Sequence, residues 1–453
     1  MNVSNGGAST ERPANPADPA NRTAPRGWYT VILLGVVSML SFVDRGVMAL
    51  FVQPMKRDFS LSDTEVSVLL GVAFTLPYVV VGFPMARFID RGNRRNLIAG
   101  CLALWSFATG VCGIAQNYWT LFVCRFVTGS AESVNTSGSL SMITDSVARD
   151  KLPRAFAIQS AGVAGGAALS LLIGGVLYGM LVHIPPTHVA GIGVIHNWQL
   201  VFMIVGIPGL LVGLLMLTTV PEPRRRGASK PGGYPLREVY NYVKGVRSLH
   251  LPLLSGMLLL SMMTSGFAAW MPAFYERTYG WGPEVVGPWL GGISLITSIL
   301  GLILGARLAE WLGTRRDDAN LRVLFIGHLL AQPLLIAMPL MPTPWLALAC
   351  AAFSGIVGVI GGPGFSAAIQ ITAPNEMRAQ VAVLYAASIT AVGGSIGPFL
   401  IGFLTDFVAG SEADLRYVLV AVKVMFGPLA VFLIWKSLAP YGRLYRERIE
   451  AGL

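Results

Sequence analysis

Five ionisable side chains lie inside long apolar stretches of this sequence and are the first candidates for chemistry: Asp44, Arg45, Arg125, Glu132 and Lys423. If those stretches cross a lipid bilayer, each charge costs about 2.5–3.5 kcal/mol at the centre of a helix, so each needs a partner or a function. A carboxylate held near an arginine at that depth can bind a proton and release it again. The sequence therefore points to proton chemistry between the stretches 28–54 and 118–140.

Arg125 and Glu132 are two helical turns apart, so both project from the same face of a helix. With a rise of 1.5 Å per residue, Arg125 lies about 11 Å and Glu132 about 21 Å from the membrane face near Tyr118, and Asp44 lies about 15 Å from the same face. We predict a proton switch in which Arg125 holds one acid ionised, while burial and repulsion between Asp44 and Glu132 favour protonation of the other. The alternative is that these charges only pin two helices together.

The other two charges need different explanations. Arg45 follows Asp44 directly and is turned by about 100° on a helix, so we expect it to contact either an anionic group of a substrate or a neighbouring helix. Lys423 lies near the start of the stretch 414–439, close enough to the outer face for its long side chain to reach water. We expect Lys423 to extend toward that face.

Elsewhere in the second half of the chain, weakly polar side chains take the place of charges: Ser261, Thr264, Trp270, Ser354, Ser366 and Gln370. A cavity with ionisable groups on one wall and a mostly apolar opposite wall suits an amphipathic substrate. A sugar would need more hydrogen-bonding side chains. We expect Arg45, Arg125 and Glu132 to contact the substrate.

The composition indicates which elements must position these residues. Of 453 residues, 54% are hydrophobic and only 12% are charged, and the mean hydropathy is +0.62. A water-soluble domain carries about 25% charged residues, so this chain is not one. Its polar residues interrupt long apolar runs and do not alternate with them, which favours helices over a β-barrel. We predict an all-α integral membrane protein.

Twelve apolar stretches are long enough to cross about 30 Å of hydrocarbon: 28–54, 66–88, 96–115, 118–140, 154–182, 199–220, 251–276, 284–312, 321–340, 344–372, 380–409 and 414–439. The Pro-, Gly- and Arg-rich segment 221–250 separates the sixth from the seventh. The predicted organisation is a disordered cytoplasmic tail (1–27), an N-terminal six-helix half (28–220), a cytoplasmic linker (221–250), a C-terminal six-helix half (251–439) and a cytoplasmic tail (440–453).

The distribution of basic residues predicts the orientation. With twelve alternating spans, three of the 33 Lys and Arg residues lie within spans and four lie on the side away from the N-terminus, which leaves 26 on the N-terminal side. Cytoplasmic loops carry this excess, so both termini should be cytoplasmic, in the plasma (inner) membrane. The net charge of +10 is thereby explained, and no nucleic-acid partner is expected.

The two halves repeat each other in their loops. In the loops after the second and eighth stretches, Asp90 and Glu310 occupy equivalent positions, and so do Arg95 and Arg315. The loops before the fifth and eleventh stretches both carry an Arg followed by Ala. Two parallel six-helix pseudo-repeats are the simplest explanation.

These motifs carry a family resemblance. The segment Asp90-Arg91-Gly92-Asn93-Arg94-Arg95 resembles the signature of the major facilitator superfamily, with Asn93 where most members have Gly. The sequence is similar to the spinster branch of that superfamily at four places: Asp44-Arg45 with Ala49, Arg125 with Gly129 and Glu132, Trp198 with Gly206, Pro208 and Gly209, and Pro221-Glu222-Pro223.

The resemblance implies alternating access and, from the animal relatives, export of sphingosine 1-phosphate or lysophospholipids. The expected function is therefore proton-coupled secondary transport of an amphipathic anionic lipid, with protons, the lipid-like substrate and membrane lipids as the only partners of a monomer. A broad-specificity drug or organic-anion transporter of the same superfamily is the alternative.

A cytoplasmic gate is predicted from the loop motif. Asp90 lies among arginines and can reach the N-terminus of the stretch 380–409, whose dipole favours an anion. That contact would lock the inner gate when the protein opens outward. The predicted gate residues are Asp90, Arg91, Arg94, Arg95, Asp145, Arg149 and Glu310. A solvated basic loop would explain the arginines, but it would not explain Asp90.

Other chemistries are not expected. The sequence has no Walker A motif, so ATP is not the energy source, and it has no His-Glu-x-x-His motif, so we predict that the protein is not an enzyme. His183, His188 and His196 fall in one predicted outer loop, but their spacing matches no common metal site. We expect neither a metal nor another cofactor.

Overall fold

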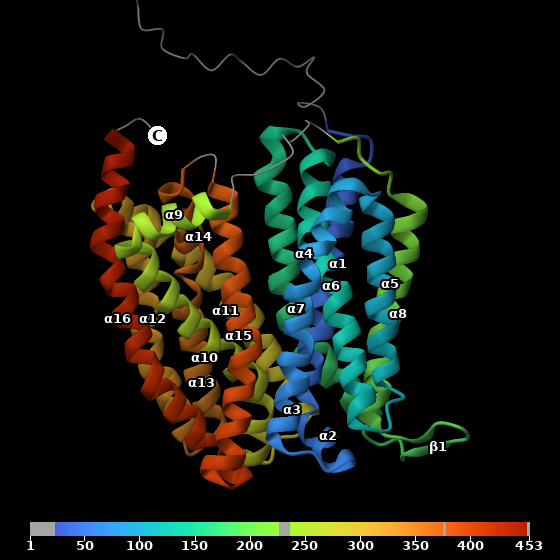
Figure 1. Cartoon of the computed structure of the whole chain (residues 1–453). Helices are drawn as coiled ribbons and strands as arrows, with labels where there is room; N and C mark the ends of the chain where they lie inside the picture. The colour runs from blue at the N-terminus through green and yellow to red at the C-terminus, as the bar shows by residue number, and fades with distance from the viewer. Residues whose placement is uncertain (1–22, 226–235, 375–376, 451–453) are drawn as a thin grey trace, which may run out of the picture.

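The structure is a computed structural model that describes residues 23–225, 236–374 and 377–450. Figure 1 shows two helical bundles side by side, one from each half of the chain. The described chain begins and ends at the same face, which we call the terminal face. The opposite face carries the antiparallel strands β1 (Thr187–Val189) and β2 (Gly193–Ile195), and we call it the hairpin face. Most of the predicted tail 1–27 and residues 226–235 of the predicted linker lie outside the described residues.

The first bundle consists of α1 (Gly27–Leu50), α2 (Val52–Phe59), α3 (Asp63–Leu70), α4 (Val72–Arg91), α5 (Arg94–Cys112), α6 (Tyr118–Ser146), the short helix η2 (Arg149–Lys151), α7 (Leu152–Leu181) and α8 (Asn197–Thr219). The linker contains α9 (Leu236–Gly245). The second bundle consists of α10 (Arg247–Tyr279), α11 (Pro283–Gly313), α12 (Ala319–Ala337), η3 (Met338–Leu340), α13 (Pro344–Val359), α14 (Gly362–Thr372), α15 (Arg378–Leu404), η4 (Thr405–Ala409), η5 (Glu412–Asp414) and α16 (Leu415–Glu450).

Local sequence sets where several of these helices begin. The Ser62 side chain accepts a hydrogen bond from the Glu65 backbone N–H, and the Glu65 carboxylate accepts one from the Ser62 backbone N–H, so a capping box starts α3. Asn93 and Asn117 cap α5 and α6 through the backbone N–H of the third residue that follows. These caps satisfy backbone groups that a membrane helix cannot leave exposed to hydrocarbon.

The twelve predicted spans are confirmed. Among the described residues, eleven helical segments are long and apolar enough to cross a membrane. The twelfth is α6, which is 29 residues long but carries Arg125, Glu132 and many hydroxyl side chains. The most polar span is thus the one that holds two of the candidate residues.

The same pairs of spans pack in both bundles. Within the first bundle, α1 packs against α7, α4 against α6 and α5 against α8; the equivalent pairs in the second bundle are α10 with α15, α11 with α13 and α12 with α16. This repeated pairing confirms the two pseudo-repeats.

Some boundaries differ from prediction. The second span breaks at Gly71 between α3 and α4, and a Cβ atom at Gly71 would lie only 2.8 Å from the Gly394 carbonyl oxygen of α15. Glycine therefore lets the two bundles approach closely at this break. Residues 440–450 of the predicted cytoplasmic tail continue α16 as a helix to Glu450.

The bundles meet through α7 against α11 and through α3 and α4 against α15. Near the hairpin face, α2 and α3 lie beside the lower end of the second bundle (Figure 1). Gly175 of α7 is in close contact with Pro288 and Gly287 of α11, so small residues bring the two helix axes together.

Candidate functional site

The three charged residues that the sequence predicts to form a proton switch, Asp44, Arg125 and Glu132, are buried where α1 and α6 meet. Glu132 is 0% exposed, and Asp44 and Arg125 are each 3% exposed. The Glu132 Oε2 atom accepts hydrogen bonds of 2.7 Å from Ser41 Oγ and 2.7 Å from Arg45 Nε. Among the described residues, Glu132 Oε1 has no hydrogen-bond partner. Glu132 is thus an ion-paired carboxylate with one oxygen free.

Arg45 is the cation that binds Glu132. Of the two contacts expected for Arg45, the structure contains the one with a neighbouring helix. Its guanidinium also lies 4.8 Å from the ring centres of Phe42, Phe74 and Tyr78, and its side chain is 23% exposed. The long side chain can reach α6 although its Cα position is turned away from that of Asp44. The orientation of Arg45 on its helix therefore does not prevent its contact with Glu132.

Arg125 has a different partner from the predicted one. Its Nε donates a 3.3 Å hydrogen bond to the Leu69 carbonyl oxygen, and its guanidinium lies 4.8 Å from the Phe74 ring centre. Leu69 is in the last turn of α3, where the break at Gly71 leaves carbonyl groups without intrahelical donors. No carboxylate of a described residue forms an ion pair with Arg125 within 4 Å. Arg125 therefore ties α6 to the break in the second span.

Asp44 lies within electrostatic reach of Glu132, Arg125 and Arg45. A salt bridge to Asp44 is absent among the described residues, so its carboxylate is buried without a directly paired cation. A Cβ atom at Gly129 would collide with the Phe74 backbone, so this glycine lets α4 pack against α6 beside the buried charges.

A set of polar side chains that sequence analysis missed continues from Glu132 toward the terminal face. Gln159 Nε2 of α7 donates a 2.8 Å hydrogen bond to Ser38 Oγ of α1, and Asn135 Nδ2 approaches the same oxygen at 3.4 Å. Ser139 Oγ donates to Asn135 Oδ1 at 3.0 Å. The available signal was the spacing of Asn135 and Ser139 behind Glu132, which places all three on one stripe of α6.

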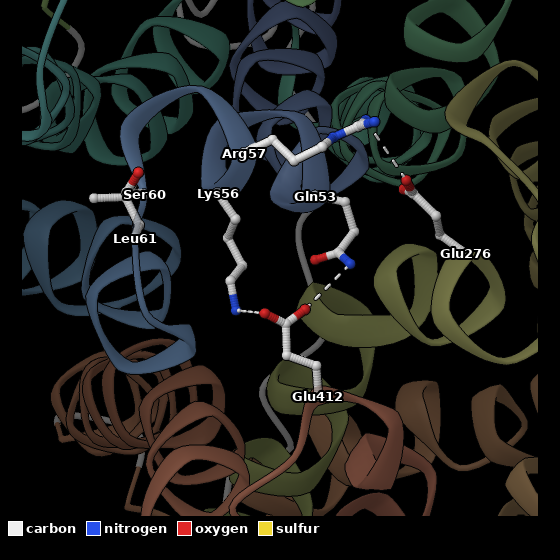
Figure 2. A pocket seen from close by; sticks show the side chains of 7 residues that line it. All are labelled: Gln53, Lys56, Arg57, Ser60, Leu61, Glu276 and Glu412. Atoms are coloured by element: carbon white, nitrogen blue, oxygen red, sulfur yellow. Dashed lines mark hydrogen bonds and ion pairs between the residues drawn. The ribbon is translucent and has the colours of Figure 1, made fainter.

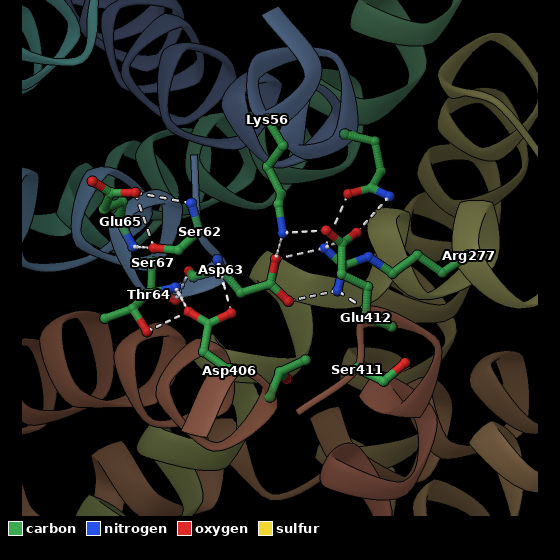
Figure 3. A network of polar contacts seen from close by, with 12 residues as sticks. Lys56, Ser62, Asp63, Thr64, Glu65, Ser67, Arg277, Asp406, Ser411 and Glu412 are labelled. Atoms are coloured by element: carbon green, nitrogen blue, oxygen red, sulfur yellow. Dashed lines mark hydrogen bonds and ion pairs between the residues drawn. The ribbon is translucent and has the colours of Figure 1, made fainter. Parts of the chain in front are cut away.

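The hairpin face is closed by ion pairs that join the two halves, and sequence analysis did not find these either. Asp63 of α3 accepts hydrogen bonds from Arg277 of α10 through both carboxylate oxygens, at 2.6 and 2.7 Å, and it also binds Lys56. Glu412 pairs with Lys56 at 2.8 Å and with Arg277 at 3.4 Å (Figure 3). We call Lys56, Asp63, Arg277 and Glu412 the hairpin-face network.

A carboxylate of the second half also caps a helix of the first. Asp406 accepts hydrogen bonds from the backbone N–H groups of Asp63 and Thr64 at the start of α3, at 3.2 and 2.7 Å, and from Thr64 Oγ1 at 2.6 Å. An anion at a helix N-terminus is favoured by the helix dipole. This is the kind of contact predicted for Asp90, but it is made on the opposite face of the molecule.

The network borders an open pocket of about 500 Å³ on the hairpin face. Figure 2 shows its lining, in which Gln53 and Lys56 point toward Glu412. Arg57 and Glu276 form a second, more exposed pair across the halves, with 4.0 Å between Nη2 and Oε1. The two halves are thus joined at the hairpin face by the largely buried hairpin-face network, by the Asp406 cap on α3 and by this more exposed pair.

The predicted gate residues lie at the terminal face, and the ones with partners bind within the first half. Arg94 is buried and donates to Asp145 Oδ2 at 2.5 Å and to Glu222 Oε1 at 2.9 Å. The Arg95 backbone N–H donates to Glu222 Oε2 at 2.8 Å. Asp90, Arg91, Arg149 and Glu310 are exposed. Among the described residues, Asp90 forms no ion pair within 4 Å, so its latch role stays a prediction.

We expect Asp90→Asn to increase the fraction of molecules that are open at the terminal face. Losing the carboxylate removes attraction to a helix N-terminus and to arginines in the state where this face closes, each worth about 0.3–1 kcal/mol at an exposed site. Single cysteines at the terminal-face ends of α6 and α14, in a background without the four native cysteines, should be labelled about two- to fivefold faster. Unchanged or slower labelling would show that Asp90 is not a latch.

The expectation that Lys423 reaches the outer face is wrong. Lys423 is 2% exposed and its Nζ lies 4.4 Å from the Phe267 ring centre, inside the second bundle. A desolvated cation–π contact contributes about 2 kcal/mol, which is less than the insertion cost of about 2.5–3.5 kcal/mol. The lysine points inward because α16 packs with this face against α10 and α12, which the sequence pattern alone did not reveal.

One motif resembles that of a hydrolase but lies in the wrong structure. Gly393-Gly394-Ser395-Ile396-Gly397 has the spacing Gly-x-Ser-x-Gly. In hydrolases this serine occupies a sharp turn between a strand and a helix. Here the segment lies inside the continuous helix α15, and its glycines pack against neighbouring helices. The motif serves helix packing and presents no nucleophile elbow.

Comparison with known proteins agrees with this architecture. Residues 34–398 match the family model of the Major Facilitator Superfamily. An MFS-type efflux pump of Mycolicibacterium smegmatis is 27% identical over 445 residues, which cover 96% of this chain and 98% of that protein. Protein spinster homolog 1 of Mus musculus is 25% identical over 344 residues, which cover 71% of this chain and 60% of that protein.

A solved structure has the same fold. The crystal structure of a bacterial homolog of the human lysosomal transporter Spinster, in an inward-facing and unoccupied conformation, matches with a TM-score of 0.77 and 24% identity, covering 94% of this chain and 98% of that chain. Because the family model covers most of the sequence, this protein belongs to the Major Facilitator Superfamily of membrane transporters, and it is similar to spinster proteins within that family.

Proposed function

We propose that this protein is a proton-coupled secondary active transporter of an amphipathic anionic lipid, such as a lysophospholipid or sphingosine 1-phosphate. The observation that carries the proposal is the pair of buried acids Asp44 and Glu132, with Arg45 bound to one and Arg125 nearby. Mid-membrane carboxylates of this kind serve proton relays. The excess of basic residues on the N-terminal side supports cytoplasmic termini, in a plasma (inner) membrane.

Binding of the substrate promotes uptake of a proton in this scheme. Arg45 is the partly exposed member of the charged group, and three aromatic rings surround it. A phosphate or carboxylate on the substrate would replace Glu132 as the partner of Arg45, since arginine binds such groups in forked geometry. Glu132 is then a buried carboxylate without its cation and takes up a proton. Loss of the substrate reverses both events.

A series of contacts links these acids to the hairpin face. Arg125 holds the Leu69 carbonyl group at the break in the second span. Beyond the break, α3 carries Asp63, which binds Arg277 of the other half. A change of charge on Asp44 or Glu132 alters the field at Arg125. In this scheme, movement of Arg125 frees α3 and opens the hairpin face, while Asp90, Arg91, Arg94, Arg95, Asp145, Arg149 and Glu310 take part in closing the terminal face.

A broad-specificity drug or organic-anion transporter is the second candidate. The mycobacterial efflux pump, which aligns with nearly the whole chain, favours it. A cavity of mixed charged and apolar lining suits drugs as well as lipids. The two candidates differ in whether an acyl chain is needed for transport.

Uptake into proteoliposomes tests both candidates. Purified protein would be given labelled lysophosphatidic acid, sphingosine 1-phosphate or a fluorescent organic anion without an acyl chain, with and without an imposed proton gradient. Uptake of the lipids that depends on the gradient supports the first candidate. Gradient-dependent uptake of the dye alone supports the second. Uptake of every substrate at the same rate without the gradient would contradict proton coupling.

A further inference from the structure

A cavity of about 450 Å³ lies inside the second bundle, away from the buried charges of α1 and α6. Helices α10, α11, α12, α13 and α16 line it, and Ala167 and Leu171 of α7 close one side. The cavity therefore borders the contact between the two halves, which is where transporters of this architecture rearrange.

Two buried polar side chains that line this cavity, Lys423 and Gln332, are incompletely paired among the described residues. Lys423 is 2% exposed, and in the part of the chain that the structure describes it forms no ion pair. Gln332 is 6% exposed, and the structure gives its buried Oε1 atom no hydrogen-bond partner. His328 lies one turn before Gln332 on α12 and also lines the cavity. No Asp or Glu is among the described lining residues, so none of them supplies a negative charge that could balance Lys423 in its charged form.

The remaining lining is mostly apolar. The Ser354 and Thr297 hydroxyl groups donate hydrogen bonds to carbonyl groups of their own helices and carry no charge that could balance a cation. Leu260, Phe267, Leu290 and Leu335 supply hydrocarbon surface. A small inorganic anion would occupy only a little of this space and would leave that surface uncovered.

We propose that this cavity binds the anionic group of an amphipathic molecule, with Lys423 supplying the charge and the side-chain N–H of Gln332 donating a hydrogen bond, while the hydrocarbon part lies against the apolar wall. A carboxylate or a phosphate monoester satisfies the chemistry equally. An anion in this cavity would form an ion pair with Lys423, whose other recorded partner among the described residues is the ring of Phe267. The choice of ligand class rests on the proposed function, but binding to the cavity does not require transport.

Equilibrium binding to the purified full-length protein in a neutral detergent tests the site. The probe is radiolabelled laurate, and dodecyl phosphate, dodecanol and inorganic phosphate serve as competitors. We expect laurate to bind wild-type protein and dodecyl phosphate to displace it. Lys423→Met keeps the length and apolar stem but removes the charge, so it should weaken binding of both anions by at least about tenfold, with no change for dodecanol.

Lys436→Met is the matched control, because Lys436 is an exposed lysine on the same helix. It should bind laurate like wild type, and thermal stability should confirm that both variants fold. Wild-type affinity in Lys423→Met, or no laurate binding to wild type, would overturn the proposal. If inorganic phosphate displaces laurate as well as dodecyl phosphate does, the proposal that the ligand is amphipathic would be overturned. If laurate and dodecyl phosphate bind in a manner that depends on Lys423 but no anion is transported, the proposed function would be contradicted, whereas the proposed binding site would be supported.

Discussion

Replacing Asp44 with Asn is expected to reduce proton-driven uptake to the level of protein-free liposomes. Asp44 is buried, and the structure contains no directly paired cation for it among the described residues, whereas Glu132 is neutralised by Arg45. Asp44 is therefore the acid whose charge is least compensated and the one that gains most from a proton. Asparagine keeps the size and hydrogen-bonding groups of the side chain but cannot titrate.

The measurement separates coupling from binding. Gradient-driven uptake should be lost, while exchange of labelled for unlabelled substrate without a gradient should persist, because exchange needs no net proton movement. Asp150→Asn is the matched control, since Asp150 is exposed in the short helix η2. Gradient-driven uptake by the Asp44→Asn protein at the wild-type rate would remove Asp44 from the proton pathway.

Replacing Asp63 with Asn is expected to open the hairpin face in most molecules. Asp63 is 0% exposed and binds Arg277 and Lys56, whose side chains are only 3% and 8% exposed. Breaking a buried ion pair by removing one partner costs about 3–5 kcal/mol. Here the loss of Asp63 leaves two buried cations to share the single, half-exposed carboxylate of Glu412. Opening the hairpin face lets water reach Lys56 and Arg277. The free-energy cost of losing the Asp63 charge therefore destabilises only the closed state. A change of about 3 kcal/mol shifts a two-state equilibrium by more than about a hundredfold.

Spin labels at Ile184 in the first half and Val408 in the second would report the opening, since both side chains are exposed on the hairpin side of the molecule. The distance distribution should move to longer values in Asp63→Asn. Arg57→Gln serves as the control, because it removes an ion pair between the halves in which Arg57 is 71% exposed, and such pairs contribute about 0–1 kcal/mol. Identical distributions in wild type and Asp63→Asn would mean that the network does not hold the face closed.

The spans and the repeat could be predicted from the sequence because their causes are local. Crossing the hydrocarbon requires about twenty consecutive apolar residues, and that requirement can be measured in a single window of sequence. The predicted stretch 344–372 matches α13 and α14 together, and the break between them did not change its length. Asp44, Arg125 and Glu132 were also identifiable, since a charge in such a window is rare and costly.

The partners of these charges were decided by the tertiary structure. Glu132 binds Arg45 and not Arg125, and Asp63 binds Arg277 from 214 positions further along the chain. Lys423 points into a cavity although its position in the sequence suggested the membrane surface. In water, the polar face of a helix marks the side that faces solvent, but here lipid and protein interior are both apolar, so the hydrophobic pattern does not say which side faces a neighbour. The sequence therefore determined where the chain crosses the membrane and which buried charges need a partner or a function. Only the packing of helices that are distant in sequence determined which of these charges are in contact.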